Sequence, residues 1–241
     1  MKKLLLSAAL VSFMSTPAFA GIYDGWSGEA SLAGSKTTGN TDTTDVGLGI
    51  NLQKESDVWR HKFNGSFDYG TNNDVDNKQR LFLGYQIDRD INDRLYAYGN
   101  GNYYNDNFGA YSEGYFVGGG LGYKVILPDP IGWDLEAGAG FRSQKTQETA
   151  LLASEKSEEL ALRAASNFDY KFNDNVSFYN DSEILWGDSD TYIWNETGIT
   201  AQLMGNLSAR ASFRIDTHSD VPAGREKTDT ITRVGVVYTI N

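Results

Sequence analysis

The chain has 241 residues, no cysteine and a formal net charge of −11, from 21 basic and 32 acidic residues. The acidic balance argues against nucleic-acid binding, which needs a basic surface, and the lack of cysteine excludes disulfides and cysteine-based zinc sites. Only two histidines, His61 and His218, are present, so sites that depend on imidazole are nearly excluded as well.

The first 20 residues have the pattern of a secretory signal peptide. Lys2 and Lys3 supply the positive charge, Leu4–Met14 is a short apolar run, and Ala18-Phe19-Ala20 is a small-x-small cleavage pattern. The apolar run is too short to cross a bilayer as a helix. We therefore expect residues 1–20 to be removed and residues 21–241 to form one exported domain.

From Trp26 to the C-terminus, apolar and polar residues alternate with period two, which is typical of strands with one apolar face. The mean hydropathy of −0.44 does not argue against a membrane protein, because membrane-spanning strands are short and polar at every second position. The predicted strands cover residues 26–33, 45–52, 59–69, 80–88, 95–104, 115–125, 133–141, 160–172, 176–186, 192–203, 207–215 and 233–240.

Three of these segments alternate less clearly than the rest. Residues 95–104 are aromatic on one parity and small on the other, so their facing is ambiguous. Residues 176–186 and 192–203 alternate less cleanly. We predict that all three are strands nevertheless.

The connections between the predicted strands form two alternating sets. The short turns lie at residues 54–57, 88–94, 127–132, 172–175 and 204–206. The longer polar loops lie at residues 37–43, 70–78, 105–112, 143–156, 187–190 and 217–228. This arrangement predicts an all-β fold: an antiparallel up-and-down transmembrane β-barrel of about twelve strands, with both ends of the chain on the periplasmic side.

Aromatic residues cluster at the predicted strand ends. Trp26, Trp59 and Trp133 begin strands that leave the periplasmic side, and Tyr69 and Trp186 lie near the opposite rim. Outer-membrane barrels carry such aromatic girdles at both interfaces with the lipid headgroups.

If the apolar parity faces lipid, the other parity lines the lumen, and it carries nearly all of the charge. On the lipid face, Arg or Lys would cost roughly 2–4 kcal/mol at mid-membrane. The charged residues predicted to face the lumen are Glu29, Asp45, Lys62, Asp68, Arg80, Glu136, Arg142, Glu159, Arg163, Asp181, Glu183, Glu196, Arg210, Arg214 and Arg233.

Arg210, Arg214 and Arg233 form a predicted basic stripe on the last two strands. We expect Glu29, Asp45 and Glu196, on strands to either side, to be their counter-charges. Two interpretations stay open: a salt-bridged interior that conducts little, which we favour, or a narrow polar channel.

Catalytic and metal-binding patterns are weak. His61 lies on the lipid-facing parity beside Trp59 and Phe63, whereas His218 lies between Asp216 and Asp220 in a predicted loop. An Asp–His pair at the outer rim could activate water in a surface hydrolase, but we strongly favour a solvated loop histidine among acids. We predict no catalytic residue, no metal site and no cofactor.

Three short motifs resemble the proteobacterial salt-induced outer-membrane protein family, a β-barrel family of unknown function. They are Trp26-Ser27-Gly28-Glu29-Ala30-Ser31-Leu32, Thr38-Gly39-Asn40-Thr41-Asp42 and Trp59-Arg60-His61. The resemblance extends over the mature chain and implies an outer-membrane barrel with no catalytic or ligand residues to carry over.

The function predicted at this stage is a structural or envelope role without catalysis, with adjustment to osmotic stress implied by the resemblance alone. The alternative is a narrow porin-like channel for small solutes or ions, and a surface hydrolase is the distant third. The expected location is the outer membrane, and the expected partners are its lipid and lipopolysaccharide, together with the barrel-assembly machinery during biogenesis.

Overall fold

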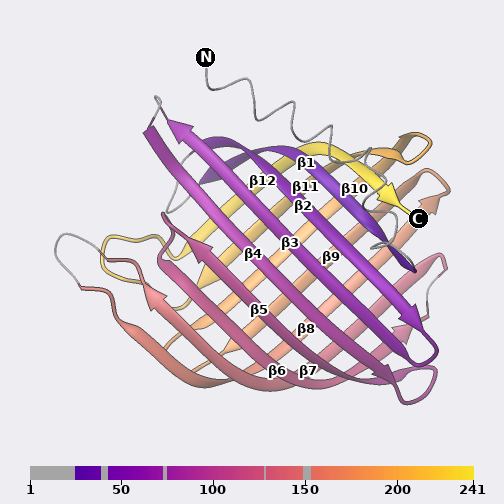
Figure 1. Ribbon diagram of the computed structural model, residues 1–241, viewed down its shortest axis with the longest axis horizontal. Helices are drawn as coiled ribbons and strands as arrows, with labels where there is room; N and C mark the ends of the chain where they lie inside the picture. Colours follow the sequence, from indigo (N-terminus) through magenta and orange to yellow (C-terminus); the bar gives the residue numbers. More distant parts are fainter. Residues whose placement is uncertain (1–24, 39–42, 73–74, 128, 149–152) are drawn as a thin grey trace.

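Twelve antiparallel strands close into a barrel in the computed structural model (Figure 1). It describes residues 25–38, 43–72, 75–127, 129–148 and 153–241, and the side chains of all of these except residues 35–38 and 43–45. The strands are β1 (Trp26–Thr38), β2 (Thr43–Ser56), β3 (Trp59–Asn72), β4 (Val75–Asp90), β5 (Leu95–Asp106), β6 (Tyr111–Ile126), β7 (Ile131–Thr146), β8 (Lys156–Asn173), β9 (Val176–Trp186), β10 (Thr191–Met204), β11 (Leu207–His218) and β12 (Thr228–Ile240).

Each strand pairs with its neighbours in sequence, and β1 pairs with β12 to close the sheet. Closure removes the free edges that an open sheet would expose. The fold class predicted from the alternation is confirmed. Among the described residues, no helix is long and apolar enough to cross a membrane.

The two ends of the barrel differ. One end is here called the turn rim. It holds the start of β1, the end of β12 and the described connections at residues 57–58, 91–94, 127, 129–130, 174–175 and 205–206 (Figure 1). At the other end, the loop rim, the described connections include residues 107–110, 187–190 and 219–227.

The predicted loop rim needs a correction, because several strands continue further than the sequence indicated. The long loop expected at residues 70–78 is wrong: β3 and β4 stay paired up to Asn72 and Val75, with a register shift after Gly70. The expected loop at residues 105–112 shortens to residues 107–110. Beyond the lipid both faces of a strand meet water, so polar residues on both parities look like a loop although the hydrogen-bond ladder continues.

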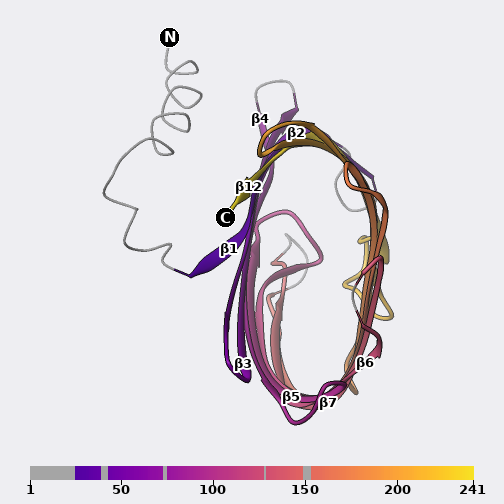
Figure 2. The same cartoon turned by 90° about the vertical axis from the view of Figure 1, so that its right-hand side faces the viewer.

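The barrel is oval in cross-section, with β8 to β11 along one long side and β5 to β7 at a narrow end (Figure 2). Glycines on the inner faces of β6 and β7 leave room for large rings at this bend. Tyr96 lies opposite Gly122, where a Cβ would overlap its ring, and the ring of Phe116 occupies the corresponding space beside Gly118 and Gly140. Glycine is typical of such tight barrel corners.

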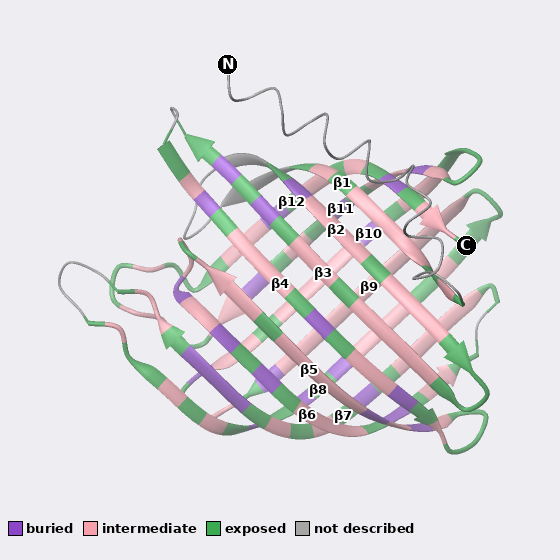
Figure 3. Cartoon of the chain, in the orientation of Figure 1, coloured by how far each residue is buried: buried purple, intermediate pink, exposed green. Residues whose placement is uncertain are grey.

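This packing decides the ambiguous facing of β5. Tyr96 and Tyr98 point inward and are buried, whereas Tyr103 points outward and is exposed. Bands of buried and exposed residues alternate along the other strands as well (Figure 3).

Candidate functional site: the charged lumen

The inner faces of all twelve strands line one cavity of about 660 Å³. Most of the charged residues predicted to face the lumen border it. They are Glu29, Lys62, Asp68, Arg80, Glu136, Arg142, Arg163, Asp181, Glu183, Glu196, Arg210, Arg214 and Arg233. Glu159 lies beside Arg142, and the side chain of Asp45 is outside the described part of the chain.

Arg163 on β8 binds two carboxylates on the inner face of the barrel, one on each neighbouring strand. Its Nη1 donates to Glu136 Oε2 at 2.6 Å and its Nε to Glu183 Oε2 at 2.7 Å. Its side chain is 8% exposed, and its guanidinium carbon lies 5.1 Å from the centre of the Tyr98 ring. Because low-dielectric surroundings strengthen charge pairs and penalise unpaired charges, this trio holds β7, β8 and β9 in register on the inner face.

A second group near the turn rim includes Arg60 and Asp88, which were not among the predicted lumen charges, together with Lys62, which was. Asp88 on β4 is fully buried and accepts hydrogen bonds from Arg60 Nε at 2.9 Å, and its Oδ2 lies 3.0 Å from Lys62 Nζ. The period-two pattern places both Arg60 and Asp88 on the polar parity. Arg60 and Asp88 lie close to predicted turns, so the sequence did not indicate that they form a buried ion pair.

The three arginines of the predicted basic stripe each meet carboxylates from other strands. Arg210 Nη2 lies 2.7 Å from Glu29 Oε2, and both Arg214 and Arg233 lie 3.8 Å from Glu196 Oε2. Glu29 and Glu196 are two of the three counter-charges expected from the sequence.

Two further carboxylates complete this network, and the sequence did not single them out as partners. Asp68 lies 3.3 Å from Arg233 Nη2, and Asp216 lies 2.9 Å from Arg214 Nη2 and 3.8 Å from Arg80 Nη1. Asp68 and Arg233 are 165 residues apart in the sequence. Barrel closure brings them together, and no local pattern marks such a pair.

At the loop rim, the connection at residues 187–190 is tied down over the lumen. Asp190 is buried and lies 2.6 Å from His218 Nδ1, while Arg142 donates to the carbonyl of Asp190 and to Glu159. Burial raises the pKa of Asp190, but the hydrogen bond and charge of His218 outweigh it and leave this pKa below its ordinary value. The Asp190 carboxyl group is therefore ionised when it holds the connection at residues 187–190 against His218.

Other loops also meet across the mouth. The hydroxyl of Tyr111, at the start of β6, donates to the Asp220 carbonyl at 3.0 Å, and Arg225 Nη1 donates to the Phe108 carbonyl at 2.9 Å. These contacts join the connections at residues 107–110 and 219–227, so the loop rim is narrowed.

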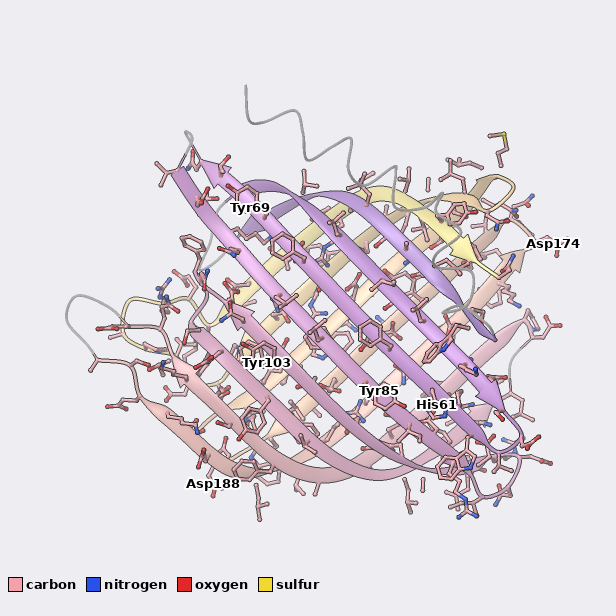
Figure 4. The ribbon with its side chains drawn as sticks, in the orientation of Figure 1. His61, Tyr69, Tyr85, Tyr103, Asp174 and Asp188 are labelled. Atoms are coloured by element: carbon pink, nitrogen blue, oxygen red, sulfur yellow. The ribbon has the colours of Figure 1, made fainter. Side chains whose placement is uncertain are left out.

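The two histidines lie in different parts of the barrel. His61 lies on the outer face, 2.6 Å from the Tyr85 hydroxyl (Figure 4). His218 stacks on Tyr192 and pairs with Asp190. The described residues also contain no cluster of three or more side chains suited to a metal.

Acidic groups outnumber basic ones in the lumen. Among the described residues that line the cavity, ten are Asp or Glu and seven are Lys or Arg. Asp169 and Asp181 border the cavity without an ion pair to any described residue. The lumen can therefore attract cations and hydrogen-bonding solutes, whereas its arginines are neutralised by carboxylates.

A closed twelve-stranded antiparallel barrel with a polar, charged interior is the architecture of outer-membrane β-barrel proteins. The chain belongs to the family described as a protein of unknown function, DUF481, whose profile matches residues 30–240. The match supports a family of unknown function, and salt induction stays a prediction from the resemblance.

Several solved structures share the fold at low sequence identity. The NanC porin has a TM-score of 0.56 at 11% identity, over 88% of this chain and 100% of that chain. The KdgM porin has a TM-score of 0.51 at 13% identity, over 88% and 99%. The translocator domain of the autotransporter NalP from Neisseria meningitidis has a TM-score of 0.50 at 15% identity, over 96% of each chain. No curated protein matches the sequence.

Proposed function

We propose that this protein is a narrow outer-membrane channel for small hydrophilic solutes, with a preference for cations. The observation that carries the proposal is the lumen cavity of about 660 Å³, bordered by all twelve strands. At about 30 Å³ for each molecule, it has room for on the order of twenty waters. A closed, side-chain-filled barrel would not hold such a volume in one piece.

The expected selectivity follows from the charges. Ten carboxyl groups and seven cationic side chains border the cavity among the described residues, so the acidic side chains outnumber the basic ones by three. Fixed charge of one sign concentrates ions of the opposite sign in a narrow, low-dielectric passage. The tied loop rim limits the passage to small solutes.

Location and partners belong to the same proposal. The signal-like residues 1–20 and the barrel support export to the outer membrane. There the turn rim faces the periplasm and the loop rim faces lipopolysaccharide, and the barrel-assembly machinery inserts the chain.

Planar-bilayer recording of the purified protein tests the proposal. We expect steady single-channel currents that rise with KCl concentration, and a reversal potential in a KCl gradient that indicates cation preference. Bilayers that stay silent after verified insertion would contradict it, and anion preference would contradict the charge argument.

A second candidate is a non-conducting barrel that maintains the envelope. The specific observation in its favour is the ion-pair network across the lumen, in which Arg163 and Arg142 are almost completely buried. Silent bilayers would support it. The osmotic part rests on the family resemblance, and the growth of a deletion strain at high salt tests it.

A further inference from the structure

The outer face of the barrel carries a group of uncharged polar side chains in the middle of three adjacent strands. We call it the outer polar cluster. It consists of Ser166 on β8, Asn180 and Ser182 on β9, and Asn195 and Thr197 on β10.

Three observations place the outer polar cluster outside the lumen. None of its members borders the lumen cavity, whereas their sequence neighbours Tyr179, Asp181 and Glu196 do. Asn180 and Ser182 share their parity with Trp186, which is 62% exposed. Asn195 and Thr197 share theirs with exposed Ile193 and Ile199.

The register makes the cluster continuous. Ser166 pairs with Ser182, Ser182 with Asn195, and Asn180 with Thr197. β9 has 11 residues, the length that spans the hydrocarbon core, and Asn180 and Ser182 lie on either side of its midpoint. The cluster therefore lies at a depth where the outer face of a barrel is normally apolar.

Hydrogen bonds within the cluster use only part of its capacity. The Nδ2 of Asn180 donates to Thr197 Oγ1 at 2.6 Å, and the Nδ2 of Asn195 donates to Ser182 Oγ at 2.6 Å and to the Asp181 carbonyl at 3.4 Å. The Thr197 hydroxyl donates to Asn195 Oδ1 at 3.4 Å, and Trp133 Nε1 donates to Ser166 Oγ at 3.1 Å. The Oδ1 of Asn180 accepts no hydrogen bond from the described residues, and the Ser182 hydroxyl donates none. Acyl chains offer no donors or acceptors, so the remaining groups would stay unpaired against lipid.

We propose that the outer polar cluster is the centre of an interface with a second copy of this chain. An amide carries both donors and acceptors, so a set of asparagines and serines is complementary to itself across a two-fold axis. The interface lies on β8 to β11, a long side of the oval cross-section, which is less curved than its narrow ends (Figure 2). Apolar Phe178, Ile193 and Phe213 border the cluster and would pack around it.

Single-cysteine cross-linking tests the proposal directly, because the chain has no cysteine of its own. Ser182→Cys introduces a thiol at the centre of the cluster. Leu83→Cys introduces one on the outer face of β4, midway along a strand on the opposite side of the barrel. After oxidation of outer-membrane fractions, we expect a disulfide dimer for Ser182→Cys and at least fivefold less for Leu83→Cys.

A second comparison tests the chemistry. Asn180→Leu and Asn195→Leu, added to Ser182→Cys, replace the amides with side chains that suit lipid, and we expect the dimer yield to fall at least fivefold. An undiminished yield would overturn the hydrogen-bonding interface. No cross-link, equal cross-linking at both cysteines, or a cross-link to a different protein would overturn the second copy as the partner.

This inference rests on the proposed membrane location but not on conduction. A monomer that conducts would overturn the dimer alone, whereas a silent dimer would overturn the channel alone.

Discussion

The buried trio around Arg163 offers a quantitative test of how dry the lumen wall is. Arg163→Met keeps much of the side-chain volume and removes the charge that Glu136 and Glu183 share. Breaking a buried pair by removing one partner costs about 3–5 kcal/mol, because it leaves charge buried without compensation. Glu136 keeps hydrogen bonds from Gln86 at 2.8 Å and Tyr96 at 2.9 Å, so we expect the lower end, about 3 kcal/mol.

The assay is urea unfolding in lipid vesicles, followed by tryptophan fluorescence. The expected change corresponds to roughly a 100-fold loss in the folding equilibrium, with an unchanged m-value. Arg210→Met is the matched control, because Arg210 and its partner Glu29 are 21% and 25% exposed. Partly exposed pairs contribute about 0–1 kcal/mol, so this variant should change little.

A third variant separates lost charge from lost packing. Adding Glu136→Gln and Glu183→Gln to Arg163→Met neutralises the carboxylates left behind, and stability should recover in large part. If Arg163→Met alone cost less than about 1 kcal/mol, as expected for a hydrated pair, water would surround the trio and the reasoning would be refuted.

Three further predictions follow from the other clusters. Arg214→Ala should shift the reversal potential in a KCl gradient towards stronger cation preference, because it removes a cation from the lumen wall; a shift towards anions would contradict it. His218→Ala should leave esterase and protease assays at background, so a wild-type activity that this variant abolishes would reopen the hydrolase hypothesis. The pKa of Asp190 is lowered, so the ionised carboxylate and the hydrogen bonds that it accepts persist above the ordinary value of 3.8 and are lost as pH falls below it. Proteolysis at residues 187–190 should therefore rise only below about pH 4, whereas Asp190→Asn should be cleaved readily at pH 7 as well.

The strand number was predictable because the period-two pattern is a local property of each segment. Lipid on one side and water on the other impose the alternation wherever a strand crosses the membrane. Beyond the membrane the constraint ends, and the extensions of β3 and β4 at Asn72 and Val75 left no such trace.

The lumen residues divide in the same way. Parity alone indicates that Arg210 and Arg233 lie on the inner face, but it cannot indicate that Asp68 reaches Arg233 or that Asp190 reaches His218. Those contacts depend on barrel closure and on loop conformation, which join residues far apart in sequence. Partners of this kind require the three-dimensional structure.

The segments with weak alternation are informative because lipid penalises any departure from the pattern. On β5, the inward aromatics Tyr96 and Tyr98 are accommodated by glycines on the next two strands, Gly122 on β6 and Gly138 on β7. The sequence of β5 alone does not show that these rings face inward, because the space for them comes from glycines on other strands. On β9 and β10, the cause is the polar side chains on the outer face, and the described barrel satisfies only part of their hydrogen-bonding capacity. The inward aromatics of β5 are accommodated within one chain. The outer polar cluster needs hydrogen-bond partners from outside the chain, and in our proposal a second copy supplies those donors and acceptors.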